Sequence, residues 1–149
     1  MNAKALRLKG ACEYAIKRWV ATEDATWCNV GTSYIAKVAG FDGFKGMIAN
    51  EMINLMKRSP DFVKVTAPAA QTAANDGKLV IAGRMDEPHG HVAVVLPGGA
   101  LVNSGKWHEE APTVANVGRT NGIMGSNWAF SLPPSYWVWL EPSNGKETV

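Results

Sequence analysis

A change of hydrophobic period half-way along the chain is the feature that most constrains its fold. Up to about residue 77, apolar side chains recur mostly at helical spacing, whereas after it they form short extended runs. Helices followed by strands, rather than alternating with them, are typical of α+β proteins with a mostly antiparallel sheet. The 149 residues suffice for one domain with a proper core and are too few for two comfortable ones. We therefore expect a single α+β domain over residues 1–149, with N-terminal helices packed on the sheet.

The first half predicts four helices. They are expected over residues 9–21, 28–39, 47–57 and, as a short capped helix, 66–77. Asp24 or Thr26 can cap the start of the second helix, and Gly40 is a common residue at a helix end. The apolar positions expected to anchor that helix on a core are Tyr34, Ile35 and Val38.

The second half predicts strands. Continuous apolar runs indicate central strands covered on both faces, at 78–83 and 91–96. Further short strands are expected at 112–117, 127–130 and 135–140. The turn Pro97-Gly98-Gly99 predicts that residues 100–103 form the hairpin partner of 91–96. Residues 62–65 form either a short strand or an extended linker, and 141–149 are a polar tail.

Charge and hydropathy argue against two classes of partner. A net charge of +2 is far below what a nucleic-acid-binding surface needs, and no apolar window approaches a membrane span. The first nine residues contain three basic side chains and no continuous apolar run, so no secretory signal is visible. We expect a monomer made in the cytoplasm that binds neither nucleic acid nor membrane.

The two cysteines are too few for a disulfide framework. Cys12 lies in an apolar helical pattern, where a cysteine usually acts as a small buried hydrophobe. A disulfide between Cys12 and Cys28 is the alternative, and it would prevent Cys28 from acting as a nucleophile. The three histidines and two cysteines show no C-x-x-C or H-x-x-x-H spacing, so we expect no zinc site.

Cys28 lies where a polar loop turns into an amphipathic helix. Unpaired N–H groups and the helix dipole favour a thiolate there, and with an imidazolium they can lower a thiol pKa from about 8.5 to roughly 3.5–7.5. His91 opens an apolar strand, and a helix packed across that strand can bring Cys28 beside it. Ala93 shares the face of His91 and is small enough for close helix approach. The pattern suggests a nucleophile and a base.

Other interpretations of these residues stay open. A cysteine at a helix start is more often structural than catalytic, and His89 is an alternative base two residues before His91. The third residue, which would accept a hydrogen bond from the imidazole and fix its tautomer, is either Asn116 or Asn103. Each of these asparagines belongs to a predicted strand that follows the histidine.

These residues resemble the papain-like cell-wall peptidases of the NlpC and CHAP type. Within that group the chain is most similar to small type VI secretion amidase effectors and single-domain phage endolysin-like hydrolases. The similarity covers about residues 12–140. It is carried by Cys28-Asn29 at a helix start, by 49–52, and by the block 69–74 with 79–83 and 90–95.

The resemblance implies a papain-like, NlpC-type fold in which Cys28 is the nucleophile and His91 the base. The family's Pro-containing strand after the histidine hairpin indicates Asn116 as the third residue, whereas a shorter-loop alignment indicates Asn103. The polar residue that usually precedes the cysteine is replaced by Trp27. The backbone N–H of Cys28 would still be available for an oxyanion hole.

The resemblance further implies hydrolysis of an amide bond in the peptidoglycan stem peptide, with γ-D-glutamyl–meso-diaminopimelate as the expected bond and no metal or cofactor. Two alternatives are an N-acetylmuramoyl-L-alanine amidase that uses the same residues and a non-catalytic wall-binding or phage structural module. A chain of this kind reaches the cell wall by holin release or by a secretion system. In the second case a cognate immunity protein is an expected partner.

Overall fold

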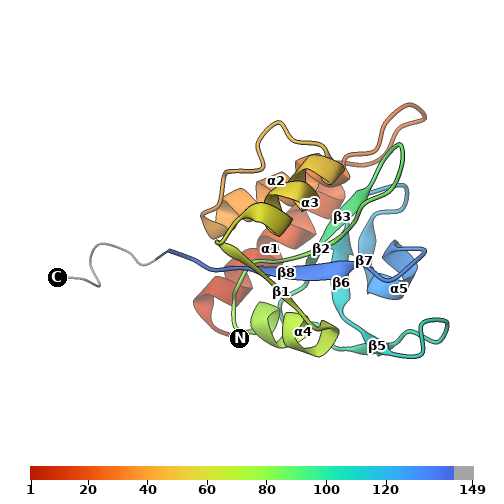
Figure 1. The fold of residues 1–149 in the computed structure, drawn as a ribbon. Helices are drawn as coiled ribbons and strands as arrows, with labels where there is room; N and C mark the ends of the chain where they lie inside the picture. Colours follow the sequence, from red (N-terminus) through yellow and green to blue (C-terminus); the bar gives the residue numbers. More distant parts are fainter. Residues whose placement is uncertain (143–149) are drawn as a thin grey trace.

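The computed structural model describes residues 1–142 and arranges them as helices on both faces of one sheet (Figure 1). The helices are α1 (Ala3–Arg18), α2 (Cys28–Ala39), α3 (Ala49–Arg58), α4 (Ala67–Asn75) and α5 (Ser126–Ala129). Buried side chains of α1, α2 and α3 form one core with the sheet, and α4 forms a second core on its other face. The predicted α+β class with N-terminal helices on an antiparallel sheet is confirmed.

All strand pairs in the sheet are antiparallel, in the order β1-β8-β2-β3-β6-β7. The six strands are β1 (Phe62–Val65), β2 (Val80–Arg84), β3 (His91–Val95), β6 (Thr113–Asn116), β7 (Gly122–Gly125) and β8 (Ser135–Trp139). A separate two-stranded sheet consists of β4 (Val102–Asn103) and β5 (Glu110–Ala111). The two continuous apolar runs are thus the central neighbours β2 and β3, as expected, and residues 62–65 are a strand rather than a linker.

The bounds of the first helix differ most from the prediction, and it ends at Arg18 instead of residue 21. The first helix begins at Ala3 instead of residue 9, because Asn2 caps it by accepting a hydrogen bond from the Ala5 N–H at 2.8 Å. The bounds of α2 are confirmed, and it ends at Gly40 with φ of 111°. The predicted caps of this helix are wrong, since its N-cap is Trp27 and no side chain bonds the first turn. The expected anchors of α2 do pack on the core.

Two predicted β elements are wrong. Residues 127–130 are not a strand, because the chain turns into α5 where the buried Ser126 hydroxyl donates to the Pro112 carbonyl at 3.0 Å. Residues 100–103 are not the hairpin partner of β3, since β4 pairs with β5 and the neighbour of β3 is β6. Seventeen residues, 96–112, separate β3 from β6, and the Leu96 N–H donates to Thr113 O at 2.8 Å where the chain returns to the sheet.

The expected role of Ala93 is also wrong. Side chains alternate along β3, and Val92 and Val94 belong to the core under α1–α3, whereas Ala93 belongs to the core under α4. Close approach of α2 depends instead on Gly31, where a Cβ atom would lie 2.8 Å from Cγ2 of Val117. A glycine one turn after Cys28 therefore seats the start of α2 on the sheet.

Both cysteines are free, with Cys12 buried and Cys28 half-buried. The interpretation of Cys12 as a buried hydrophobe is confirmed, and Cys28 retains its thiol. None of the helices within residues 1–142 is long and apolar enough to cross a membrane. Most of the predicted polar tail, 143–149, lies outside the described residues.

Candidate active site

Cys28 is the first residue of α2, and three backbone N–H groups are directed at its sulfur. They belong to Cys28 itself, to Asn29 in the same turn and to Val92 in β3. Val92 directly follows His91 in the chain, so the thiol lies beside the start of β3. The structure thus brings the first turn of α2 to the residue next to the predicted base.

His91 is the first residue of β3 and its ring is held by Asn116, the last residue of β6. The ring Nε2 lies 2.6 Å from the Asn116 Oδ1. The Asn116 Nδ2 donates to the carbonyl of Thr120 at 2.9 Å, which fixes the amide with its oxygen toward the ring. Since that oxygen only accepts, Nε2 must carry the proton and Nδ1 keeps its lone pair. A neutral His91 is therefore prepared to accept a proton at Nδ1.

Two further neighbours restrict the rotation of the His91 imidazole. Phe130 packs against it with ring centroids 4.9 Å apart. At Gly118 an added Cβ would lie 3.2 Å from the imidazole Cε1, so the backbone itself closes one side of the ring. Packing and the bond to Asn116 together fix the ring's orientation.

The structure distinguishes the two candidate asparagines. Asn103 lies in β4, in the separate two-stranded sheet, and its side-chain oxygen accepts from the Gly105 N–H at 2.9 Å. Asn116 alone of the two bonds to His91. His89 is exposed and lines the same cleft as Cys28, so it stays an alternative base.

Cys28 opens into a cleft of about 450 Å³. The cleft lies between the 24–27 loop, the starts of α2 and α3, and the segment that leads into β3. Its lining includes Trp27, Asn29, Ile48, Asn50, His89, Gly90 and Arg119. A half-buried thiol at the edge of a cleft of this size is accessible to an extended substrate.

Asn50 and Gly90 fix the segment before His91, and sequence reasoning gave neither of them a role. The Asn50 amide donates to Asp86 O at 2.9 Å and accepts from the Asp86 N–H at 3.4 Å. At Gly90 an added Cβ would collide with the Asn50 side chain and lie 2.8 Å from the Arg84 carbonyl. The glycine that directly precedes the histidine was the sequence signal for this close approach.

Burial dominates the protonation of both reactive groups. It raises the pKa of the Cys28 thiol above its ordinary value, although the three N–H groups act in the opposite direction. It lowers the pKa of His91, and the hydrogen bond to Asn116 only partly opposes this. The predicted lowering of the thiol pKa is therefore wrong for the free protein, because desolvation outweighs the helix start. Burial thus favours the neutral thiol of Cys28 and the neutral imidazole of His91.

Within residues 1–142, no three His, Cys, Asp or Glu side chains lie close enough together to hold a metal ion. Comparison of the sequence with protein-family models and with curated proteins gives no match.

Proposed function

We propose that the protein is a cysteine hydrolase that cleaves an amide bond in the peptidoglycan stem peptide. Cys28 is the nucleophile, His91 the base and Asn116 the residue that orients the base. The observation that supports this most strongly is the 2.6 Å bond from His91 Nε2 to Asn116, which leaves Nδ1 free to accept a proton. The Cys28 thiol interacts with the N–H of Val92, the residue that follows His91. The substrate class comes from the resemblance to the papain-like NlpC and CHAP peptidases, whose fold we propose for this chain.

In the proposed first step the imidazole Nδ1 takes the thiol proton as the sulfur attacks the amide carbon. The resulting oxyanion accepts hydrogen bonds at the helix start, with the Cys28 N–H as one donor. The Nδ1–H of His91 then protonates the departing amine and leaves a thioester on Cys28. Water attacks the thioester while Nδ1 removes its proton, which releases the carboxylic acid and restores the thiol.

Because burial favours the neutral forms of both groups, the proposed first step needs His91 to take the thiol proton. A preformed ion pair would need a lowered thiol pKa, and burial acts against one. The enzyme therefore depends on His91 as a general base, which makes the orientation of its ring decisive.

The proposed bond is γ-D-glutamyl–meso-diaminopimelate, and an N-acetylmuramoyl-L-alanine amidase is the alternative reaction at the same residues. Mass spectrometry of digested sacculi distinguishes them, since the first exposes an amine on diaminopimelate and the second one on L-alanine. We further propose delivery to the wall by holin release or by a secretion system. In the second case a cognate immunity protein would fill the cleft.

The test is digestion of purified sacculi by the wild type, Cys28→Ala and Cys12→Ala, with circular dichroism to verify folding. We expect products from the wild type and from Cys12→Ala, and none from Cys28→Ala. Turnover by folded Cys28→Ala would contradict the proposal. Binding of all three proteins to sacculi without any product would support the non-catalytic alternative instead.

A further inference from the structure

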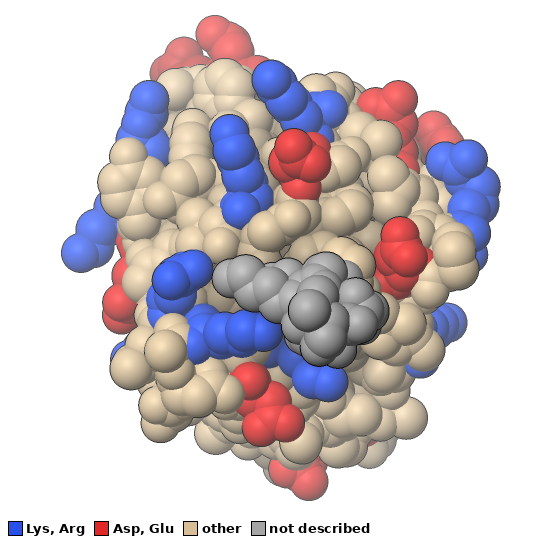
Figure 2. All heavy atoms as spheres, turned by 90° about the vertical axis from the view of Figure 1, so that its left-hand side faces the viewer, with Lys and Arg blue, Asp and Glu red and all other residues tan. Residues whose placement is uncertain are grey.

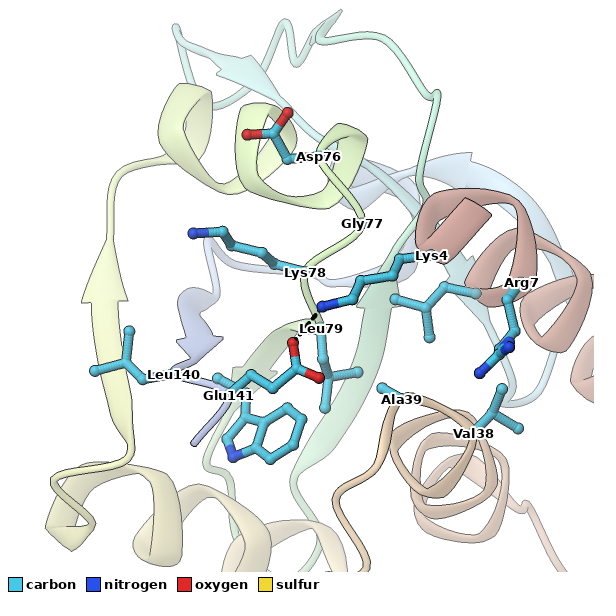
Figure 3. Close-up of a pocket in the computed structure, with 12 residues that line it drawn as sticks. Lys4, Arg7, Val38, Ala39, Asp76, Gly77, Lys78, Leu79, Leu140 and Glu141 are labelled. Carbon is cyan, nitrogen blue, oxygen red and sulfur yellow. Dashed lines mark hydrogen bonds and ion pairs between the residues drawn. The ribbon is translucent and has the colours of Figure 1, made fainter. Parts of the chain in front are cut away.

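A second pocket, of about 400 Å³, lies at the opposite end of α2 from Cys28. It is lined by the first turns of α1, the last residues of α2, the turn after α4 and the end of β8 (Figure 3). The twelve residues of α2 place its two ends about 16 Å apart, at about 1.5 Å per residue. This pocket is therefore separate from the candidate active site, and the inference does not rest on the proposed function.

The pocket combines an apolar floor with a basic rim. Leu8, Leu79 and Trp139 are buried side chains of its floor. The rim carries three exposed basic side chains, from Lys4, Arg7 and Lys78. Figure 2 faces this side of the molecule and shows Lys and Arg side chains close together near its middle. Such a lining suits a ligand with an apolar body and an anionic group.

A carboxylate of the chain already interacts with this rim. The Glu141 Oε2 lies 2.6 Å from the Lys4 Nζ, and Figure 3 shows the two side chains pointing toward each other among the pocket residues. The second acidic residue of the rim, Asp76, points away from this pair (Figure 3). Glu141 thus marks where a carboxylate is accepted.

The Lys4–Glu141 pair is easily displaced. Its side chains are 67% and 52% exposed, and exposed ion pairs contribute little to stability. Arg7 and Lys78 form no ion pair with any other residue in the part of the chain that the structure describes. A carboxylate from outside can therefore replace Glu141 at Lys4, where Arg7 and Lys78 on the same rim add positive charge to its surroundings.

We propose that this pocket is a binding site for an amphiphilic carboxylate. Its carboxylate binds Lys4 in place of Glu141, Arg7 and Lys78 add positive charge around it, and its hydrocarbon part covers Leu79 and Trp139. Both parts of the ligand contribute to its binding free energy, because its hydrocarbon surface is removed from water while its charge is neutralised.

The probe is octanoate, with octanol as its neutral counterpart, titrated into the full chain and followed by ¹H–¹⁵N NMR. We expect shifts at the Trp139 indole and the Leu79 amide, and octanoate affinity about tenfold or more above that of octanol. Arg7→Gln and Lys78→Gln should weaken octanoate binding, whereas Glu141→Gln should strengthen it by removing the competing carboxylate. Lys45→Gln, an exposed lysine outside the pocket, is the matched control and should leave binding unchanged.

Equal affinity for octanoate and octanol would overturn the proposal, as would shifts confined to other parts of the protein. Loss of affinity in Lys45→Gln equal to that in Arg7→Gln would also overturn it, because the effect would then reflect net charge only. The titration is repeated with Cys28→Ala, in which octanoate should bind unchanged. That result separates this site from the proposed catalytic one, whatever the outcome of the digestion experiment.

Discussion

Replacement of Asn116 by Ala removes the acceptor that fixes the His91 ring. The ring Nε2–H would lose its 2.6 Å partner inside a largely buried site. Leaving a buried donor without a partner costs about 1–3 kcal/mol, and a ring free to bond elsewhere can also adopt the tautomer with its proton on Nδ1. We therefore expect kcat to fall about 5- to 150-fold, since each 1.4 kcal/mol is a factor of about ten.

The assay is initial-rate digestion of a defined muropeptide, with kcat and KM determined separately. KM should change little, because Asn116 lies behind the imidazole and is 5% exposed. Asn103→Ala is the matched control, since it removes the same side chain from an exposed position in β4. The ¹⁵N shifts of His91 provide a readout without substrate, with the Nε2–H tautomer expected in the wild type and a mixture in Asn116→Ala. Unchanged kcat and unchanged ring shifts in Asn116→Ala would refute the reasoning.

Three further predictions follow from the same structure. The acid limb of kcat/KM should lie below pH 6.5, because burial lowers the pKa of His91 and keeps the base neutral; a limb above 6.5 in a pH–rate profile would contradict this. Gly90→Ala should lower both the melting temperature and kcat through its collision with Asn50, whereas Gly10→Ala, with nothing within 4 Å, should stabilise α1 by about 1 kcal/mol. Burial raises the pKa of Cys12 to about 12, so between pH 9.0 and that pKa only the thiol of the unfolded chain ionises. The free energy of unfolding should therefore fall in this range by about 1.4 kcal/mol per pH unit on account of Cys12. Denaturant titrations at several pH values should show a shallower fall in Cys12→Ala.

Local periodicity was enough to predict much of the fold. The bounds of α2, the central strands β2 and β3, and the buried Cys12 all depend on residues close together in sequence. The choice between Asn116 and Asn103 could not be made from neighbouring residues, because it depends on which later strand pairs with β3. The chain leaves the sheet after Leu96, and the next strand along the chain is therefore not the neighbour of β3.

The face of β3 on which α2 packs could not be predicted from neighbouring residues either. A strand covered on both faces has no alternation of polar and apolar residues, so nothing distinguishes the Val92 side from the Ala93 side. The predicted lowering of the Cys28 pKa was wrong for a related reason. A helix start is visible in the sequence, but the depth to which the thiol is buried is not. The bonds from Asn50 to Asp86 join segments 36 residues apart, and only the glycine before His91 gave a sign of them.

The central claim is that the thiol of Cys28 and the imidazole of His91 act as a pair. The most direct test is the rate of Cys28 alkylation by iodoacetamide between pH 5 and 10, followed by peptide mass spectrometry in the wild type and in His91→Ala. We expect the wild type to react at neutral pH with a midpoint set by His91, and His91→Ala to react only as the pH approaches the raised pKa of the thiol, with Cys12 unreactive in both. Identical pH profiles for the two proteins would contradict the account.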